Sequence, residues 1–202
     1  MLHLLGRGIM PEWNEEKHDR DEVFAFLCYR GTHYAKTVYI DFCMEGPSWF
    51  LNNPRKMILK LIPNTHPILH ERVKPCSKNL DRREMSRILK ENMFHYKGIG
   101  LSANQVGISE RVFVMMLNIE TEETITCFNP RIVKRYEDDV WFEEGCLSFP
   151  DEIINIQRPN RIVVKYEDED KKDHKIKLDG LAARVFLHEY DHLQGIVFTE
   201  RQ

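Results

Sequence analysis

A pair of histidines four residues apart restricts the fold of this chain more than any other feature of its sequence. They begin and end the run His188-Glu189-Tyr190-Asp191-His192. Residues at positions i and i+4 are neighbours on an α-helix, where two imidazoles can bind one metal ion with Glu189 beside it. We therefore predict a helical metal site, against the alternative that both histidines lie on a solvated helix face.

The residues around this run predict a complete helix from 179 or 180 to 193. Gly195 follows as a typical stop signal, because helices often end on a glycine in the left-handed conformation. Leu181 and Val185 share the face of the two histidines and turn that face towards the core. The histidine run is thus expected to be buried.

A second helix and several strands are expected elsewhere. Asp81 has the position of an N-cap with Glu84 three residues on, and predicts a helix that ends near Gly98. Strands in the middle and a helix at each end favour an α+β fold over alternating βαβ units. Short apolar runs separated by turn residues predict strands at 57–62, 111–117, 124–128, 132–133, 161–166 and 196–199.

Residues 1–56 differ from the rest of the chain. They are rich in aromatic residues but show no sustained helical or strand period. A turn-like stretch at 52–56 precedes the apolar run that begins at Met57. We predict a functional domain at 57–202 and an N-terminal extension at 1–56. The extension is either disordered, or not part of the functional protein, or a partner-binding arm.

Charge and cysteine content exclude several classes of protein. The chain has 29 Lys and Arg against 32 Asp and Glu, so no basic surface for nucleic acid or an anionic membrane is expected. No apolar run approaches the roughly 18 residues that a membrane span needs. The five cysteines include no CxxC pair, which favours a reducing compartment. The N-terminus resembles no secretory signal or transit peptide, so we predict a cytoplasmic protein.

A catalytic metal needs a third protein ligand and an open position for water. Only ten residues follow His192, so this ligand is expected upstream. Cys146 is the best candidate because Gly145 lets the backbone come close to a metal and the thiolate is a strong ligand. The alternative for a single cysteine is a small buried hydrophobic residue.

Three segments together resemble a known family. They are Gly98-Ile99-Gly100-Leu101-Ser102-Ala103-Asn104-Gln105, Glu144-Gly145-Cys146-Leu147-Ser148 and the histidine run at 188–192. In order and separation they resemble the three signature motifs of the peptide deformylases. The second and third match in full, whereas the first has Ser102 where the family usually has Ala, a change that we expect to be tolerated. The similarity runs from about Met57 to Phe198.

The resemblance implies a deformylase-like α+β fold with antiparallel strands around a central metal-binding helix. It also implies a metal-dependent hydrolase that removes the formyl group from the N-terminal formylmethionine of newly made polypeptides. Carried over by position, the metal ligands are Cys146, His188 and His192. The family uses Fe(II), often replaced by Zn, Ni or Co, and the ligand types do not choose among these ions.

The catalytic roles follow from the same resemblance. A divalent metal lowers the pKa of a bound water towards ~7, so that the water can attack the formyl carbon. Glu189, next to a ligand, is expected to take the water proton and deliver it to the departing amine. The side-chain amide of Gln105 and the backbone N–H of Leu147 would donate to the formyl oxygen as it gains negative charge.

Substrate contacts are also implied. Ile99, Leu181 and Val185 are expected to form an apolar slot for the methionine side chain, and Gly100 to allow close approach of the substrate. Core packing is the alternative for Leu181 and Val185. Many bacterial deformylases have an Arg seven residues after the metal cysteine, where this chain has Ile153, which leaves the handling of longer peptides open.

Two acidic residues near the motifs have supporting roles in the resemblance. Glu144 is expected to pair with Arg158 and so brace the loop of the metal cysteine, against the alternative of a surface carboxylate. Asp191 either orients a ligand or lies on a solvated face.

Two other functions remain open at this point. One is another HExxH metallohydrolase, and the other is a catalytically silent metal-binding module with the same fold. For the deformylase, the expected partners are nascent formylmethionyl polypeptides, and we expect the protein to associate with the ribosome. No nucleic acid partner is evident and no membrane partner is expected. We expect the protein to be a monomer.

Overall fold

The computed structural model describes residues 56–201, which form seven strands and two α-helices. The α-helices are α2 (Arg82–His95) and α3 (Gly180–Gln194). Three short 3-10 helices are η1 (Pro67–Leu69), η2 (Ala103–Val106) and η3 (Phe198–Arg201). The strands are β1 (Gly100–Ser102), β2 (Val112–Asn118), β3 (Glu123–Arg135), β4 (Asp139–Cys146), β5 (Phe149–Pro159), β6 (Arg161–Glu167) and β7 (Asp173–Asp179).

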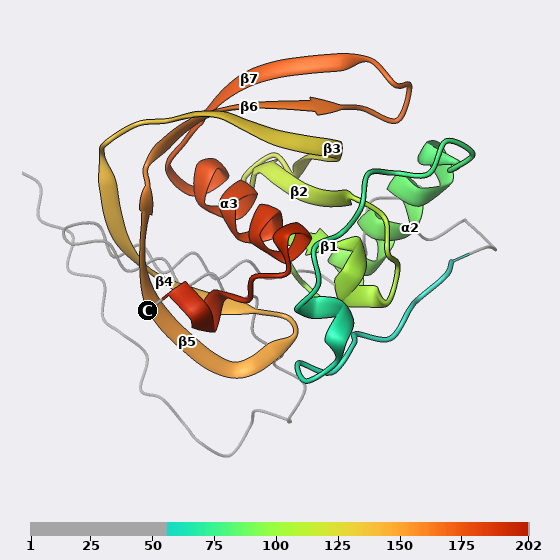
Figure 1. Cartoon of the computed structure of the whole chain (residues 1–202), viewed down its shortest axis with the longest axis horizontal. Helices are drawn as coiled ribbons and strands as arrows, with labels where there is room; N and C mark the ends of the chain where they lie inside the picture. Colours follow the sequence, from blue (N-terminus) through green and yellow to red (C-terminus); the bar gives the residue numbers. More distant parts are fainter. Residues whose placement is uncertain (1–55, 202) are drawn as a thin grey trace, which may run out of the picture.

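Two antiparallel sheets lie on either side of α3 (Figure 1). The larger has the strand order β1-β2-β3-β6-β7, and the smaller contains β4 and β5. The helix contacts β1, β2 and β7 of the larger sheet and β5 of the smaller one. Its buried side chains Val185, Phe186 and Leu193 belong to the main core. The predicted α+β fold, with antiparallel strands around a central helix, is confirmed.

α3 begins and ends close to the predicted residues. Gly195 follows it in the left-handed conformation, with φ of 72°. A Cβ at this position would lie 2.6 Å from the carbonyl carbon of Glu71, whose backbone crosses the end of the helix. Both the backbone conformation and the close packing therefore require glycine here.

Gly195→Ala should lower the free energy of unfolding by about 2–4 kcal/mol, because a strained conformation and a backbone clash add together. Gly180→Ala is the matched control: Gly180 also has a positive φ, 52°, but its Cβ would meet nothing within 4 Å. We expect the control to lose about 1–2 kcal/mol. Urea unfolding of both variants measures the difference, and equal losses would show that the contact with Glu71 is unimportant.

α2 begins at the predicted N-cap. The carboxylate of Asp81 accepts the backbone N–H of Glu84 at 3.0 Å. The helix ends at His95, three residues before Gly98. This prediction is confirmed apart from that small difference.

The strand predicted at 57–62 is wrong. This segment runs beside α2, and Asn92 accepts the N–H of Leu59 at 2.7 Å and donates to the carbonyl of Met57 at 2.8 Å. The hydroxyl of Tyr96 donates to the carbonyl of Leu59 at 2.6 Å. Side chains of α2 and of its C-cap residue Tyr96 thus satisfy backbone groups that a neighbouring strand would otherwise satisfy.

The strands predicted at 124–128 and 132–133 form one continuous strand, β3. Asn129 takes a left-handed conformation within it, with φ of 49°, and the register with β6 shifts between Phe128 and Arg131. Asparagine tolerates this conformation, so a bulge replaces the predicted break. β2 and β6 confirm the strands predicted at 111–117 and 161–166, whereas β1, β4, β5 and β7 are additional.

The strand predicted at 196–199 is also wrong, because residues 196 and 197 lie in no strand and η3 begins at Phe198. Phe198 is buried, with its ring centroid 5.6 Å from that of Phe149 and 5.8 Å from that of His188. Arg201 donates from Nε to the carboxylate of Asp191 at 3.0 Å. A helical turn brings both side chains back onto α3 and β5, which an extended chain would not do.

The extension predicted at residues 1–56 lies, apart from its last residue, outside the described part of the chain. Within residues 56–201, neither α-helix has the length and apolar character that crossing a membrane requires.

Candidate active site

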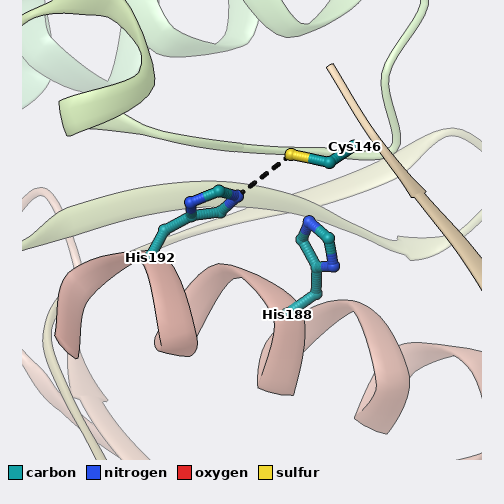
Figure 2. A group of neighbouring side chains, drawn as sticks. All are labelled: Cys146, His188 and His192. Carbon is teal, nitrogen blue, oxygen red and sulfur yellow. Dashed lines mark hydrogen bonds between the residues drawn. The ribbon is translucent and has the colours of Figure 1, made fainter. Parts of the chain in front are cut away.

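Two histidines of α3 and one cysteine of β4 form the centre of the site (Figure 2). His188 and His192 project from neighbouring turns of the helix towards Cys146 at the end of the strand. The ligand atoms of the three residues lie within 4.8 Å of one another, and all three residues are buried. The sulfur of Cys146 lies 3.3 Å from Nε2 of His192.

This group has the chemistry of a site for a divalent transition metal. Donor atoms bound to one tetrahedral ion are roughly 3.3–3.6 Å apart, close to the separation of Cys146 and His192. Burial and the neighbouring His188 lower the pKa of His192 well below its usual value, so its ring is neutral and has a lone pair to donate. Burial alone would lower the pKa of His188, but Cys146 and Glu144 raise it well above the usual value. The surroundings of His188 therefore favour a positive charge beside Cys146 and Glu144.

The carboxylate of Glu144 orients one of the histidines. Its Oε2 lies 3.0 Å from Nδ1 of His188, which leaves Nε2 of that ring for the site. Arg158 donates to both carboxylate oxygens, at 2.6 and 2.9 Å, as predicted for this pair. Burial by itself would raise the pKa of Glu144, but the hydrogen bonds from His188 and Arg158 hold it well below its usual range. Glu144 is therefore an ionised carboxylate without solvent exposure.

Arg184 is a second buried cation beside Glu144, and none of the three motifs predicts it. It donates to Glu144 Oε1 at 2.8 Å and to the carbonyls of Ile156 and Val140 at 2.9 and 2.7 Å. One guanidinium thus joins α3 to both strands of the smaller sheet. An arginine four residues before His188, on the buried face of a helix, is the signal that could have identified it.

Asp191 is buried, so its alternative position on a solvated face is wrong. It accepts from Arg158 Nη1 at 2.6 Å and from Arg201 at 2.5 and 3.0 Å. Arg158 lies between two carboxylates, Glu144 and Asp191. Asp191 therefore connects η3, through Arg201, to Arg158 and so to Glu144, which orients His188.

Glu189 lies in a different environment from Glu144. Burial raises the pKa of Glu189 to about 7, although its hydrogen bond from Ser102 opposes this. The hydroxyl of Ser102 lies 2.8 Å from Oε2 of Glu189. On the other side, a Cβ at Gly100 would lie 2.4 Å from Oε1, so only glycine fits against this carboxylate. Gly100 therefore packs directly against the carboxylate of Glu189.

Gln105 and Leu147 flank the cysteine. The backbone N–H of Ser102 donates to Oε1 of Gln105 at 2.9 Å, which fixes the amide. Its Nε2 then faces Ser148 Oγ at 3.2 Å and Cys146 Sγ at 3.5 Å. Leu147 follows Cys146 in the turn between β4 and β5, within the same region.

Ile99, Leu181 and Val185 come together in one pocket of about 370 Å³. Gly100 is the next residue after Ile99 but does not line this pocket. Ile153 lies on β5 opposite Gly145 and is half exposed. The remaining residues of the pocket are Met116, Leu117, Asn118, Ile119, Glu120 and Ala182.

Comparisons with known proteins identify the family of this chain. The sequence model of the family described as polypeptide deformylase matches residues 58–202. The peptide deformylase of Thermotoga maritima is 42% identical over 138 residues, which cover 67% of this chain and 81% of that protein. Its crystal structure has a TM-score of 0.68 at 38% identity and covers 72% of this chain and 97% of that one. A probable peptide deformylase from Synechococcus phage S-SSM7 has a TM-score of 0.66 at 40% identity, over 71% and 99% of the two chains. The chain therefore belongs to the polypeptide deformylase family.

Proposed function

We propose that the site on α3 removes the formyl group from the N-terminal formylmethionine of newly made polypeptides. The observation that carries this proposal is the buried group of Cys146, His188 and His192 with the carboxylate of Glu189 beside it, in a chain of this family. Such a site suits metal-dependent amide hydrolysis. The alternatives, another HExxH metallohydrolase or a silent metal-binding module, are not favoured by the relatives.

Cys146, His188 and His192 would hold one divalent ion. We propose Fe(II), with Zn, Ni or Co as substitutes, because a thiolate and two imidazoles suit each of these ions. When bound, the ion supplies Lewis acidity that activates water and polarises the formyl carbonyl. Glu144 holds the ring of His188 in the orientation that this binding requires.

Glu189 moves the protons of the reaction. It takes a proton from the attacking water as the water oxygen bonds to the formyl carbon. It then delivers that proton to the amine nitrogen as the C–N bond breaks and formate leaves. A pKa of about 7 suits a group that must both accept and release a proton near neutral pH.

Gln105 and Leu147 would stabilise the charge that develops on the formyl oxygen. The amide of Gln105 is held by Ser102, so its Nε2 would donate from a fixed orientation beside Cys146. The backbone N–H of Leu147 is the second donor in this proposal. The pocket of Ile99, Leu181 and Val185 would take the methionine side chain, with Gly100 beside the peptide backbone.

The working protein is proposed to be a cytoplasmic monomer that acts on chains at the ribosome. The near balance of charges gives no separate sign of a ribosome-binding surface. The domain at 57–202 would be sufficient for activity, since the contacts of Met57 are made to Glu91 and Asn92 of α2.

The test is release of formate from formyl-Met-Ala-Ser by the full chain, prepared without oxygen and loaded with Fe(II). We expect release that stops when a chelator removes the metal. A shortened chain that begins at Met57 should have the same kcat/KM within about twofold. No formate from fully loaded protein would contradict the proposed function, whereas loss of activity only in the shortened chain would contradict the predicted domain boundary.

A further inference from the structure

Ser102 lies at the end of β1 and faces α3 across the core. The residue has no solvent exposure and pairs with Phe113 of β2. Its hydroxyl lies 2.8 Å from Oε2 of Glu189 and 3.0 Å from the carbonyl oxygen of Glu189. A hydroxyl has one proton to donate, and a carboxylate is the stronger acceptor of the two. The side chain therefore binds the carboxylate of Glu189.

Ser102 contacts two residues of the site, and its hydroxyl oxygen also takes part in a capping box with the backbone of Gln105. The backbone N–H donates to Gln105, whereas the hydroxyl donates to Glu189. Substituting the side chain leaves the backbone N–H in place. Ser102→Ala therefore keeps the backbone contact that orients the amide of Gln105, and removes the hydroxyl from both Glu189 and the capping box.

The carboxylate of Glu189 is held from two sides. Oε1 lies against Gly100, at the position where a Cβ would be only 2.4 Å away. Oε2 accepts from Ser102, and within residues 56–201 this hydroxyl is the side-chain donor found for that carboxylate. Without it, the carboxylate could rotate about its terminal bond, because torsions of this kind are broad.

We propose that Ser102 is a positioning residue for Glu189: its hydroxyl fixes Oε2 and so keeps Oε1 against Gly100, which holds the carboxylate in one orientation for proton transfer. The inference rests on the proposed function. It gives a role to the one position at which the first motif departs from the usual family sequence. Serine in place of the usual alanine is compatible with the fold, but in this chain the hydroxyl of Ser102 contributes to the rate of deformylation.

The test compares Ser102→Ala with Ser86→Ala, each assayed as the full chain loaded with Fe(II). Ser86 is the matched control, since it is also buried and bonds through its hydroxyl, to Thr126 at 2.7 Å, away from the site. We expect Ser102→Ala to lower kcat about tenfold, as for the loss of a hydrogen bond to a charged group. KM, metal content and the unfolding midpoint should match those of Ser86→Ala, whose kcat should stay within about twofold of wild type.

A double-mutant cycle then shows whether Ser102 acts through Glu189. In Glu189→Asp the carboxylate is one methylene shorter, so the hydroxyl cannot reach it in the same way, and adding Ser102→Ala should change kcat less than twofold. An unchanged kcat in Ser102→Ala, or an equal loss in both backgrounds, would overturn this inference alone. Absence of formate release by loaded wild-type protein would instead overturn the function on which it rests.

Discussion

Glu189→Gln should lower kcat for deformylation by about 10²–10⁴-fold, the range typical of removing a general acid-base group. Glutamine keeps the size of the side chain and can still accept from Ser102, but its amide cannot take a proton from water. The three metal-binding side chains are unchanged, so metal content should stay that of wild type. Formate release and metal analysis of the same preparation measure both results.

Glu143→Gln is the matched control for this variant. Glu143 lies on β4 next to Glu144, but it is partly exposed. Its register partner on the neighbouring strand β5 is Asn155. Its kcat should stay within about twofold of wild type. If Glu189→Gln kept more than a tenth of the wild-type kcat, Glu189 would not be the proton-transfer group.

Glu144→Gln should have the largest effect on stability, a loss of about 3–5 kcal/mol of unfolding free energy. The carboxylate is the shared acceptor of Arg158, Arg184 and His188, and all four side chains are buried. A neutral amide would leave the buried guanidinium of Arg184 without the counter-charge of Glu144, and Arg158 with only that of Asp191. Metal affinity should fall by roughly 10–100-fold, because His188 loses the partner that orients its ring.

Urea unfolding and competition with a chelator measure these two losses separately. Asp170→Asn is the matched control, because Asp170 pairs with Arg83 at 2.6 Å on the surface, where both side chains are more than half exposed. An exposed pair of this kind contributes at most about 1 kcal/mol. A loss at Glu144 no larger than that at Asp170, with unchanged metal affinity, would contradict the role given to the buried network.

The two glutamates show how position in the fold sets the properties of the same side chain. Glu144 is surrounded by cationic donors and stays ionised, whereas Glu189 has one hydroxyl donor and burial raises its pKa to about 7. The first suits a permanent acceptor that holds other side chains in place. The second suits a group that exchanges a proton, and neither property is visible in the motifs themselves.

Local spacing in the sequence predicted α3, its stop at Gly195 and the N-cap at Asp81. These features depend on residues within one or two helical turns of each other, so the sequence alone is sufficient to identify them. The order of the three motifs likewise indicated the family, because it is a property of the chain rather than of its packing. The pair of Glu144 and Arg158 followed from the same resemblance.

Contacts between residues far apart in the chain decided the features that the sequence did not predict. Whether 57–62 and 196–199 become strands depends on what lies beside them. A side chain of α2 bonds the backbone of the first segment, and after the second segment Arg201 pairs with Asp191 of α3. Ser102 and Arg184 acquired their contacts only when β1 and the smaller sheet packed against α3. Sheet pairing and buried polar contacts join residues far apart in the chain, so local patterns carry little information about them.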